Sequence, residues 1–99
     1  MKALTWQGIG QVAYEDVPDP VLQNPDDAIV RVERSAVCGS DLHAYRGRIR
    51  GLVPGTILGH EYVGQVVDVG SAVTEFRPGD PVFGSFSTAC GRCWPCRRG

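Results

Sequence analysis

The chain has 99 residues, a formal net charge of −1, and 42% hydrophobic and 21% charged residues. These are the values of one globular domain, and they exclude a disordered chain. No charge run exceeds two residues, no apolar run could cross a bilayer, and no secretory stretch follows Met1, so we expect a cytoplasmic protein without a nucleic-acid or membrane partner.

Short β-rich runs separated by glycine and proline fill the first part of the chain. Lys2–Trp6 and Gln11–Val17 predict a hairpin that turns at Gln7–Gly10. Gly8–Ala13 also matches the loose dinucleotide-binding pattern G-x-G-x-x-A, but that pattern requires a helix to follow. A β-like run and two prolines follow instead, which favours a glycine turn over a cofactor loop.

A third strand and a short helix come next. Ala28–Val37 alternates in polarity, with Val30 and Val32 on one face, and therefore predicts a strand. Ser40 could cap a short helix that runs through Leu42–Tyr45 and is ended by Gly47.

Two further strands are predicted in the second half. Tyr62–Val69 alternates, with Val63, Val67 and Val69 on one face, and Pro81–Phe86 follows a proline–glycine turn. Short strands with closely spaced turns predict a mostly β fold, a partly open barrel or a sandwich, without defining the order of the strands.

The four cysteines of the chain are unevenly spread. Cys90, Cys93 and Cys96 lie within seven residues, and Cys38 is remote from them. Without a signal peptide, this clustering favours metal binding over a disulfide framework.

Residues Cys38, His60 and Glu61 form the first candidate metal site. A thiolate, an imidazole and a carboxylate are all good zinc ligands, and catalytic zinc sites keep one position open. Asp41 lies three residues after Cys38 and could accept the N–H of a ligating histidine. Spacing alone leaves the alternative of a buried thiol and an ordinary hydrogen-bonded histidine open.

The second candidate site is the knuckle Cys90-x₂-Cys93-x₂-Cys96. Its spacing can wrap thiolates around one metal, and structural zinc takes four ligands. Three free or oxidised thiols are one alternative. An iron–sulfur cluster is another, because ferredoxin-type runs read C-x₂-C-x₂-C-x₃-C.

Three motifs together closely resemble the medium-chain dehydrogenase/reductase superfamily and, within it, the zinc-dependent alcohol dehydrogenases. They are Cys38–His43, Gly59–Gly64 and Cys90–Cys96. The resemblance continues through Met1–Ala3, Val66–Gly70 and Arg77–Val82. It implies a GroES-like, partly open β-barrel with short helices and a zinc-knuckle lobe at the C-terminal end. Residues 1–99 would then be an incomplete N-terminal catalytic domain without the Rossmann cofactor domain.

The resemblance also assigns the metal ligands. Cys38 and His60 match the first two ligands of the catalytic zinc. Glu61 matches a carboxylate that ligates the metal in some members and stands beside it in others, and Asp41 matches the partner of the zinc histidine. The three knuckle cysteines match ligands of a structural zinc. The family's further catalytic ligand and its fourth knuckle cysteine would lie beyond residue 99.

Two more residues are assigned to the reaction. Ser40 matches the hydroxyl that touches the substrate oxygen, although its role as a helix cap stays open. His43 matches the outer end of the proton relay and a cofactor contact, and imidazole suits proton exchange with solvent near neutrality.

The resemblance implies an oxidoreductase in which zinc polarises the oxygen of a small alcohol, aldehyde or polyol while hydride passes to or from NAD or NADP. A full-length protein of this kind is expected to be a homo-oligomer, and the isolated 99-residue chain is expected to be inactive. Two alternatives are a stand-alone zinc-binding or interaction domain and a chaperonin-10-like module, which would need neither the cysteines nor Gly59–Glu61.

Overall fold

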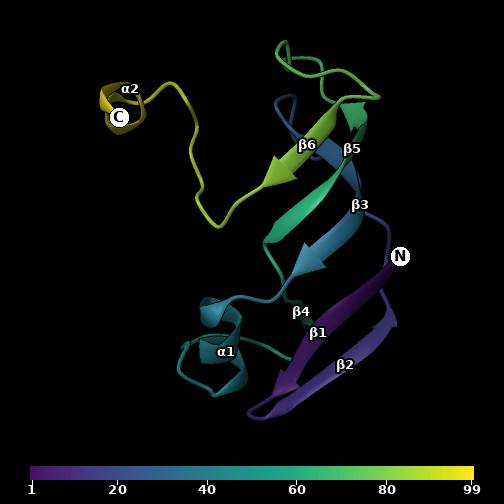
Figure 1. The fold of residues 1–99 in the computed structure, drawn as a ribbon, viewed down its shortest axis with the longest axis vertical. Helices are drawn as coiled ribbons and strands as arrows, with labels where there is room; N and C mark the ends of the chain where they lie inside the picture. Colours follow the sequence, from purple (N-terminus) through teal and green to yellow (C-terminus); the bar gives the residue numbers. More distant parts are fainter.

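A computed structural model describes all residues, 1–99, and contains two separate three-stranded antiparallel sheets with two short helices (Figure 1). The sheet orders are β2-β1-β4 and β3-β5-β6. In chain order the elements are β1 (Lys2–Gly8), β2 (Gln11–Asp16), β3 (Ala28–Ala36), α1 (Gly39–Tyr45), β4 (Thr56–Ile57), β5 (Glu61–Val69), β6 (Pro81–Gly84) and α2 (Trp94–Arg98). The mostly β, partly open architecture expected from the sequence is therefore confirmed.

The first sheet is built on the predicted hairpin. Strands β1 and β2 pair from Lys2 with Asp16 to Gly8 with Gln11, so the glycine pattern between them makes a turn and opens no helix. Gly10 in that turn has φ of +72°, a conformation that only glycine adopts readily. Strand β1 lies in the middle and carries much of the small core, including the fully buried Thr5.

The second sheet is arranged around β5, which pairs with β3 on one side and β6 on the other. Its pairing with β3 places Ala36, the last residue of β3, opposite Glu61, the first residue of β5. Val66 is 2% exposed, whereas Val63 and Val67 are 46% and 42% exposed. The predicted Val63–Val67 face is therefore the more exposed of the two.

Helix α1 starts two residues earlier than expected, and Ser40 does not cap it. Cys38 occupies the N-cap position with an extended backbone, and its N–H is bound by the carboxylate of Asp41, 3.0 Å away. Ser40 thus lies inside the first turn, where its hydroxyl is free for other contacts. At the other end, Gly10 donates a 2.8 Å hydrogen bond to the carbonyl of Tyr45, which fastens the helix to the β1–β2 turn.

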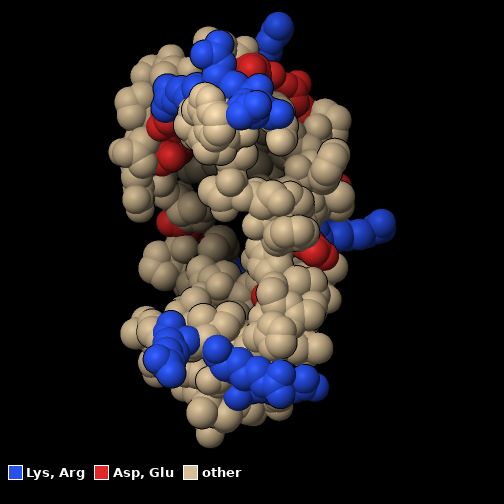
Figure 2. Space-filling view, turned by 90° about the vertical axis from the view of Figure 1, so that its left-hand side faces the viewer, with Lys and Arg blue, Asp and Glu red and all other residues tan.

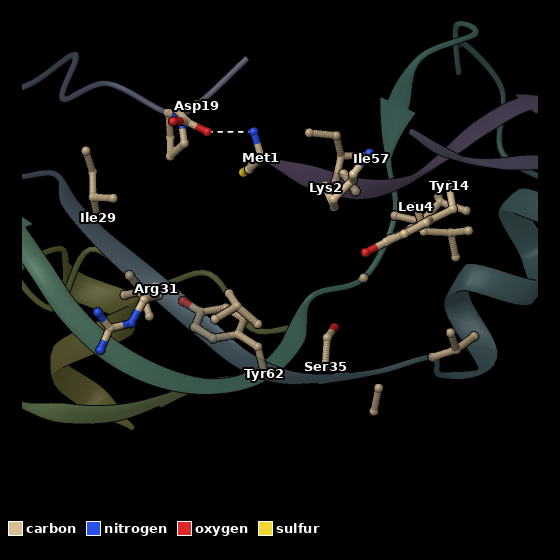
Figure 3. Close-up of a pocket in the computed structure, with 18 of the residues that line it drawn as sticks. Met1, Lys2, Leu4, Tyr14, Asp19, Ile29, Arg31, Ser35, Ile57 and Tyr62 are labelled. Atoms are coloured by element: carbon tan, nitrogen blue, oxygen red, sulfur yellow. Dashed lines mark hydrogen bonds and ion pairs between the residues drawn. The ribbon is translucent and has the colours of Figure 1, made fainter. Parts of the chain in front are cut away.

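A wide apolar cavity of about 860 Å³ separates the two sheets (Figure 3). Its apolar walls include Leu4 and Ile57 from one sheet and Ile29, Val32 and Val67 from the other. The accessible surface is 7655 Å², against roughly 5,500 Å² for a folded monomer of 10.7 kDa. The sheets therefore do not close upon each other within residues 1–99.

The C-terminal lobe stands away from the sheets on an extended segment after β6 (Figure 1). Its short helix α2 has a proline in the first turn, and Arg98 stacks on Trp94 at 4.8 Å. Arg92 forms an ion pair with Asp26, with a distance of 2.9 Å between the charged atoms, and this pair connects the lobe to the loop before β3. Neither of the two helices is long and apolar enough to span a bilayer.

Candidate metal centres

The pairing of β3 with β5 brings Cys38 and His60 together. Cys38 follows the end of β3 and His60 precedes the start of β5, and these ends are neighbours in the ladder. The Cys38 Sγ and His60 Nε2 atoms lie 3.0 Å apart, although the two residues are 22 positions apart in the sequence. Two good zinc ligands that are far apart in the sequence thus point at one spot.

The Ser40 hydroxyl joins this pair. Its Oγ lies 2.9 Å from Cys38 Sγ and 3.1 Å from His60 Nε2. Hydrogen bonding, above all with this hydroxyl, lowers the pKa of the Cys38 thiol. The hydrogen bond with Cys38, together with the negative charges of that thiolate, Asp41 and Glu61, raises the pKa of His60. The site therefore favours the thiolate, which is the form of cysteine that binds metal.

Asp41 contacts the backbone at both candidate ligands and the ring of His60. It is 6% exposed, and its Oδ2 accepts the Cys38 N–H while its Oδ1 accepts the Gly59 N–H at 3.2 Å. The same Oδ1 is 3.6 Å from Nδ1 of His60, so the other ring nitrogen, Nε2, faces the cysteine. Because both carboxylate oxygens already have donors, Asp41 is suited to orienting the ligands and not to binding the metal itself.

We expect Asp41→Asn to weaken zinc binding by about 10–100-fold and to lower stability by about 1–3 kcal/mol. Either orientation of the new amide sets an NH₂ group against a backbone N–H, of Cys38 or of Gly59, so one buried donor pair is left unsatisfied. Zinc affinity is measured by competition with a chromophoric chelator and stability by urea unfolding. Asp68→Asn, on the exposed part of β5, is the matched control, and equal effects in both variants would contradict this role of Asp41.

The structure places the remaining two residues of the first site outside this cluster. Glu61 is the first residue of β5, and its carboxylate is not among the ligand atoms of Cys38, Asp41 and His60 that lie within 4.8 Å of one another. His43 is exposed in the last turn of α1. It follows Ser40 by three residues and therefore lies on the same face of the helix.

A small cavity of about 250 Å³ opens beside the cluster, and Ser40, Asp41 and His60 line it. The rest of its wall is mostly apolar and comes from α1, from the loop after it and from the segment around β4; the apolar residues are Ala44, Ile49, Leu52, Ile57 and Leu58. Sequence reasoning missed this wall. Only the apolar residues Ile49 and Leu52 in an arginine- and glycine-rich loop could have indicated it.

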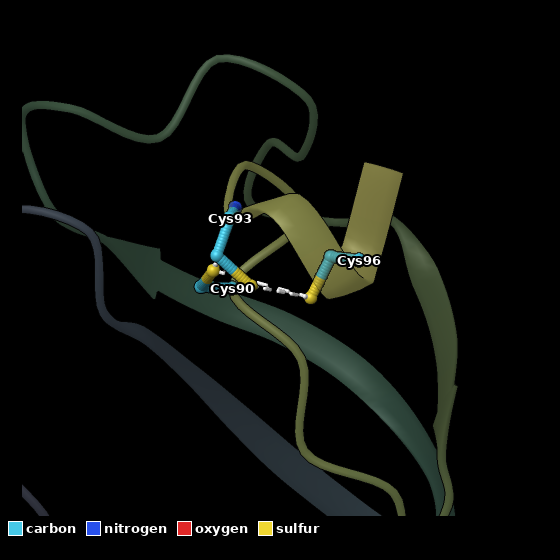
Figure 4. A group of neighbouring side chains, drawn as sticks. All are labelled: Cys90, Cys93 and Cys96. Carbon is cyan, nitrogen blue, oxygen red and sulfur yellow. Dashed lines mark hydrogen bonds between the residues drawn. The ribbon is translucent and has the colours of Figure 1, made fainter. Parts of the chain in front are cut away.

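The three cysteines of the lobe also converge, as Figure 4 shows. The Sγ atoms of Cys93 and Cys96 are 3.3 Å apart, and those of Cys90 and Cys96 are 4.0 Å apart. Backbone hydrogen bonds, first from Arg92 and then from Cys93, lower the pKa of Cys90 to about 7. A substantial fraction of Cys90 is therefore thiolate at neutral pH before any metal binds.

Both clusters have donor sets that suit zinc. Sulfur and nitrogen atoms bound to one tetrahedral zinc lie roughly 3.5–4 Å apart, given bond lengths of about 2.3 Å and 2.0 Å. The distances between the cluster atoms are within an ångström of that spacing. The first cluster offers a cysteine sulfur and an imidazole beside an open cavity, and the second offers three cysteine sulfurs, of which two are exposed and one is half-buried.

Comparison with known proteins gives a consistent result. Residues 24–99 match the family described as the alcohol dehydrogenase GroES-like domain. The chain is 46% identical, over 97 residues, to an uncharacterized zinc-type alcohol dehydrogenase-like protein, AdhB, of Bacillus subtilis (strain 168). The match covers 98% of the chain but 26% of that relative, so the chain spans about a quarter of its length.

Two solved structures show the same fold. One is the alcohol dehydrogenase TADH from Thermus sp. ATN1, with a TM-score of 0.91 and 49% identity. The other is zinc dependent alcohol dehydrogenase 2 from Streptococcus pneumonia in its apo form, with a TM-score of 0.91 and 43% identity. In both cases the match covers 99% of this chain and 28% of the solved one.

Proposed function

Since the chain belongs to the alcohol dehydrogenase GroES-like domain family, we propose that it supplies the metal-binding, substrate-facing part of a zinc-dependent alcohol dehydrogenase. The reaction would transfer a hydride between a small alcohol or aldehyde and NAD or NADP. One observation carries the proposal: a cysteine sulfur, an imidazole and a hydroxyl meet within 3.1 Å of one another at the wall of a cavity. The B. subtilis relative and both solved proteins are named as alcohol dehydrogenases or similar to them, which agrees with this reaction class.

Cys38 and His60 would hold the catalytic zinc, and Glu61, which follows His60 in the chain but lies outside the cluster, would be a carboxylate beside the metal. When bound, zinc acts as a Lewis acid that polarises the substrate oxygen. Asp41 keeps the His60 ring turned so that Nε2 faces the site, and it holds the backbone of Cys38 and Gly59 at a constant separation. The chain thereby presents its ligands in one arrangement before the substrate arrives.

Ser40 and His43 would move the proton. The Ser40 hydroxyl lies at the cavity wall beside both ligands, where it could accept the proton of the substrate hydroxyl while it passes its own proton on towards His43. His43 is exposed one helical turn further along α1 and can exchange that proton with solvent. It is also our candidate for a cofactor contact. The apolar wall around Ile49 and Leu52 would exclude water from the reacting carbon.

In this proposal Cys90, Cys93 and Cys96 hold a second, structural zinc away from the reaction. The three sulfur atoms lie within 4.8 Å of one another, and no substrate-sized apolar cavity adjoins them among the cavities described above. The zinc would keep the lobe folded around helix α2, which has only five residues and no buried side chain. A helix this short is marginal in water without such a constraint.

Removal and return of the metal tests the function. The protein that contains this chain is assayed with NAD⁺ and NADP⁺ on a panel of primary, secondary and polyhydric alcohols. We expect turnover that a chelator abolishes and that added zinc restores. The 99-residue chain alone is expected to bind zinc and to show no turnover. Full activity that survives complete removal of zinc would contradict the proposal.

A further inference from the structure

The loop that follows α1 carries three arginines in five residues: Arg46, Arg48 and Arg50. All three are exposed. In Figure 2, blue side chains gather at the lower end of the molecule, where α1 and its loop lie, and no red side chain lies among them. The face of this end that Figure 2 shows is therefore positive, although the chain as a whole carries a net charge of −1.

These arginines have no partner within the chain. The ion pairs of the structure join Asp16, Asp19, Asp26 and Asp41 to other groups, and none of them includes this loop. The arginine side chains that donate hydrogen bonds are Arg31 and Arg92. Arg46 at the helix C-terminus has a structural explanation, because a cation there complements the helix dipole. Arg48 and Arg50 have none.

The position of the loop connects these two residues with the first metal centre. Ile49, which stands between them, lines the same small cavity as Ser40 and His60. The N–H of Arg48 donates a 2.9 Å hydrogen bond to the carbonyl of His43, which anchors the backbone of the loop to α1. Two guanidinium groups are thus attached on either side of a residue in the cavity wall.

We propose that Arg48 and Arg50 bind a phosphate group of a ligand whose reacting end lies at Ser40 and His60. This inference rests on the proposed function. Guanidinium groups form paired hydrogen bonds with phosphate, and two of them match its double negative charge. The phosphate can belong to a phosphorylated alcohol substrate or to the dinucleotide cofactor, and the chemistry of recognition is the same for both.

Direct binding provides the first test. Inorganic phosphate is titrated into the zinc-loaded protein by calorimetry, with the Arg48→Ala/Arg50→Ala double variant alongside. We expect the double variant to bind at least about tenfold more weakly. Arg77→Ala, which removes one exposed arginine at the opposite end of the molecule, is the control and should bind like the wild type. Arg48→Lys/Arg50→Lys keeps the charge and should retain part of the affinity.

Kinetics then separates the two sources of phosphate. If the phosphate is on the alcohol, the double variant lowers kcat/KM about tenfold for a phosphorylated polyol and leaves the unphosphorylated polyol unchanged. If it is on the cofactor, the KM for NAD⁺ or NADP⁺ rises with either alcohol. The inference is overturned if the double variant matches the wild type in both tests, or if Arg77→Ala weakens phosphate binding equally.

Failure of the enzyme assignment gives a different pattern. Phosphate binding that depends on Arg48 and Arg50, in a protein that turns over no alcohol, would leave the phosphate site standing and remove the proposed function. Normal alcohol turnover with no effect of the two arginines in either test would remove only the phosphate site.

Discussion

Replacing Cys38 or His60 with alanine is expected to remove one zinc ion per chain and to lower kcat/KM by at least about a thousandfold. The two side chains supply the sulfur and the imidazole of the first cluster, 3.0 Å apart, and the Ser40 hydroxyl is the one other group of the cluster that is hydrogen-bonded to both of them. Lewis-acid polarisation contributes several kcal/mol to such a reaction, and each 1.4 kcal/mol is about tenfold in rate. Zinc content is measured by mass spectrometry of the purified protein, and turnover by formation of the reduced cofactor.

The chain offers a matched control, because His43 is its one other histidine. His43→Ala should retain both zinc ions, since its ring lies outside the metal cluster, and should slow the reaction through loss of the proton relay. Two zinc ions per chain in Cys38→Ala or His60→Ala would contradict the assignment of these ligands.

The second large effect is expected at Gly64, in the middle of β5. A Cβ atom added there would lie 2.3 Å from the carbonyl oxygen of Arg31 and 2.9 Å from a methyl group of Val30. The added Cβ would clash with the backbone of β3, and a paired backbone cannot move away by changing a rotamer as a side chain can. Gly64→Ala should therefore lower the free energy of unfolding by about 3 kcal/mol, measured by urea denaturation.

Gly8→Ala is the control for this effect, because Gly8 also lies in a strand and its added Cβ would meet only the side chain of Gln11, at an ordinary 3.7 Å. We expect a change of less than about 1 kcal/mol there. If Gly64→Ala and wild type unfold at the same urea concentration, the close β3–β5 approach is wrong. Since that approach also positions Cys38 beside His60, zinc affinity should fall together with stability in Gly64→Ala.

Local sequence patterns predicted most of the strands, with ends within two residues of those observed. Alternation of polar and apolar residues is a property of a single strand, and a glycine or proline turn is a property of a few consecutive residues. Both signals can therefore be read without knowing the rest of the fold. The two-residue strand β4 was not predicted, because it exists only through its pairing with β1. Helix α2 was also missed, although Pro95 near its start is a signal that could have indicated it.

The candidate site was predictable as a set of residues but not as a geometry. The motifs around Cys38 and His60 indicate zinc chemistry, yet only the β3–β5 register shows that the two side chains meet. The cap of α1 was misassigned to Ser40, because serine is common at cap positions. In the structure Cys38 is the cap residue, and the Asp41 carboxylate accepts the N–H groups of both Cys38 and Gly59. The apolar cavity wall is assembled by the tertiary fold, and the sequence offered only Ile49 and Leu52 of the loop after α1 as a signal for it.

The long-range pairing of β3 with β5 has a consequence for the order in which the two metal centres can acquire zinc during folding. Cys38 and His60 become neighbours only after the intervening chain has been closed into a loop, which carries an entropic cost. Cys90, Cys93 and Cys96 are neighbours even in the unfolded chain. On the proposed assignment, the three cysteines of the lobe can therefore bind metal while the chain is still unfolded, whereas Cys38 and His60 can bind it only after β3 and β5 have paired.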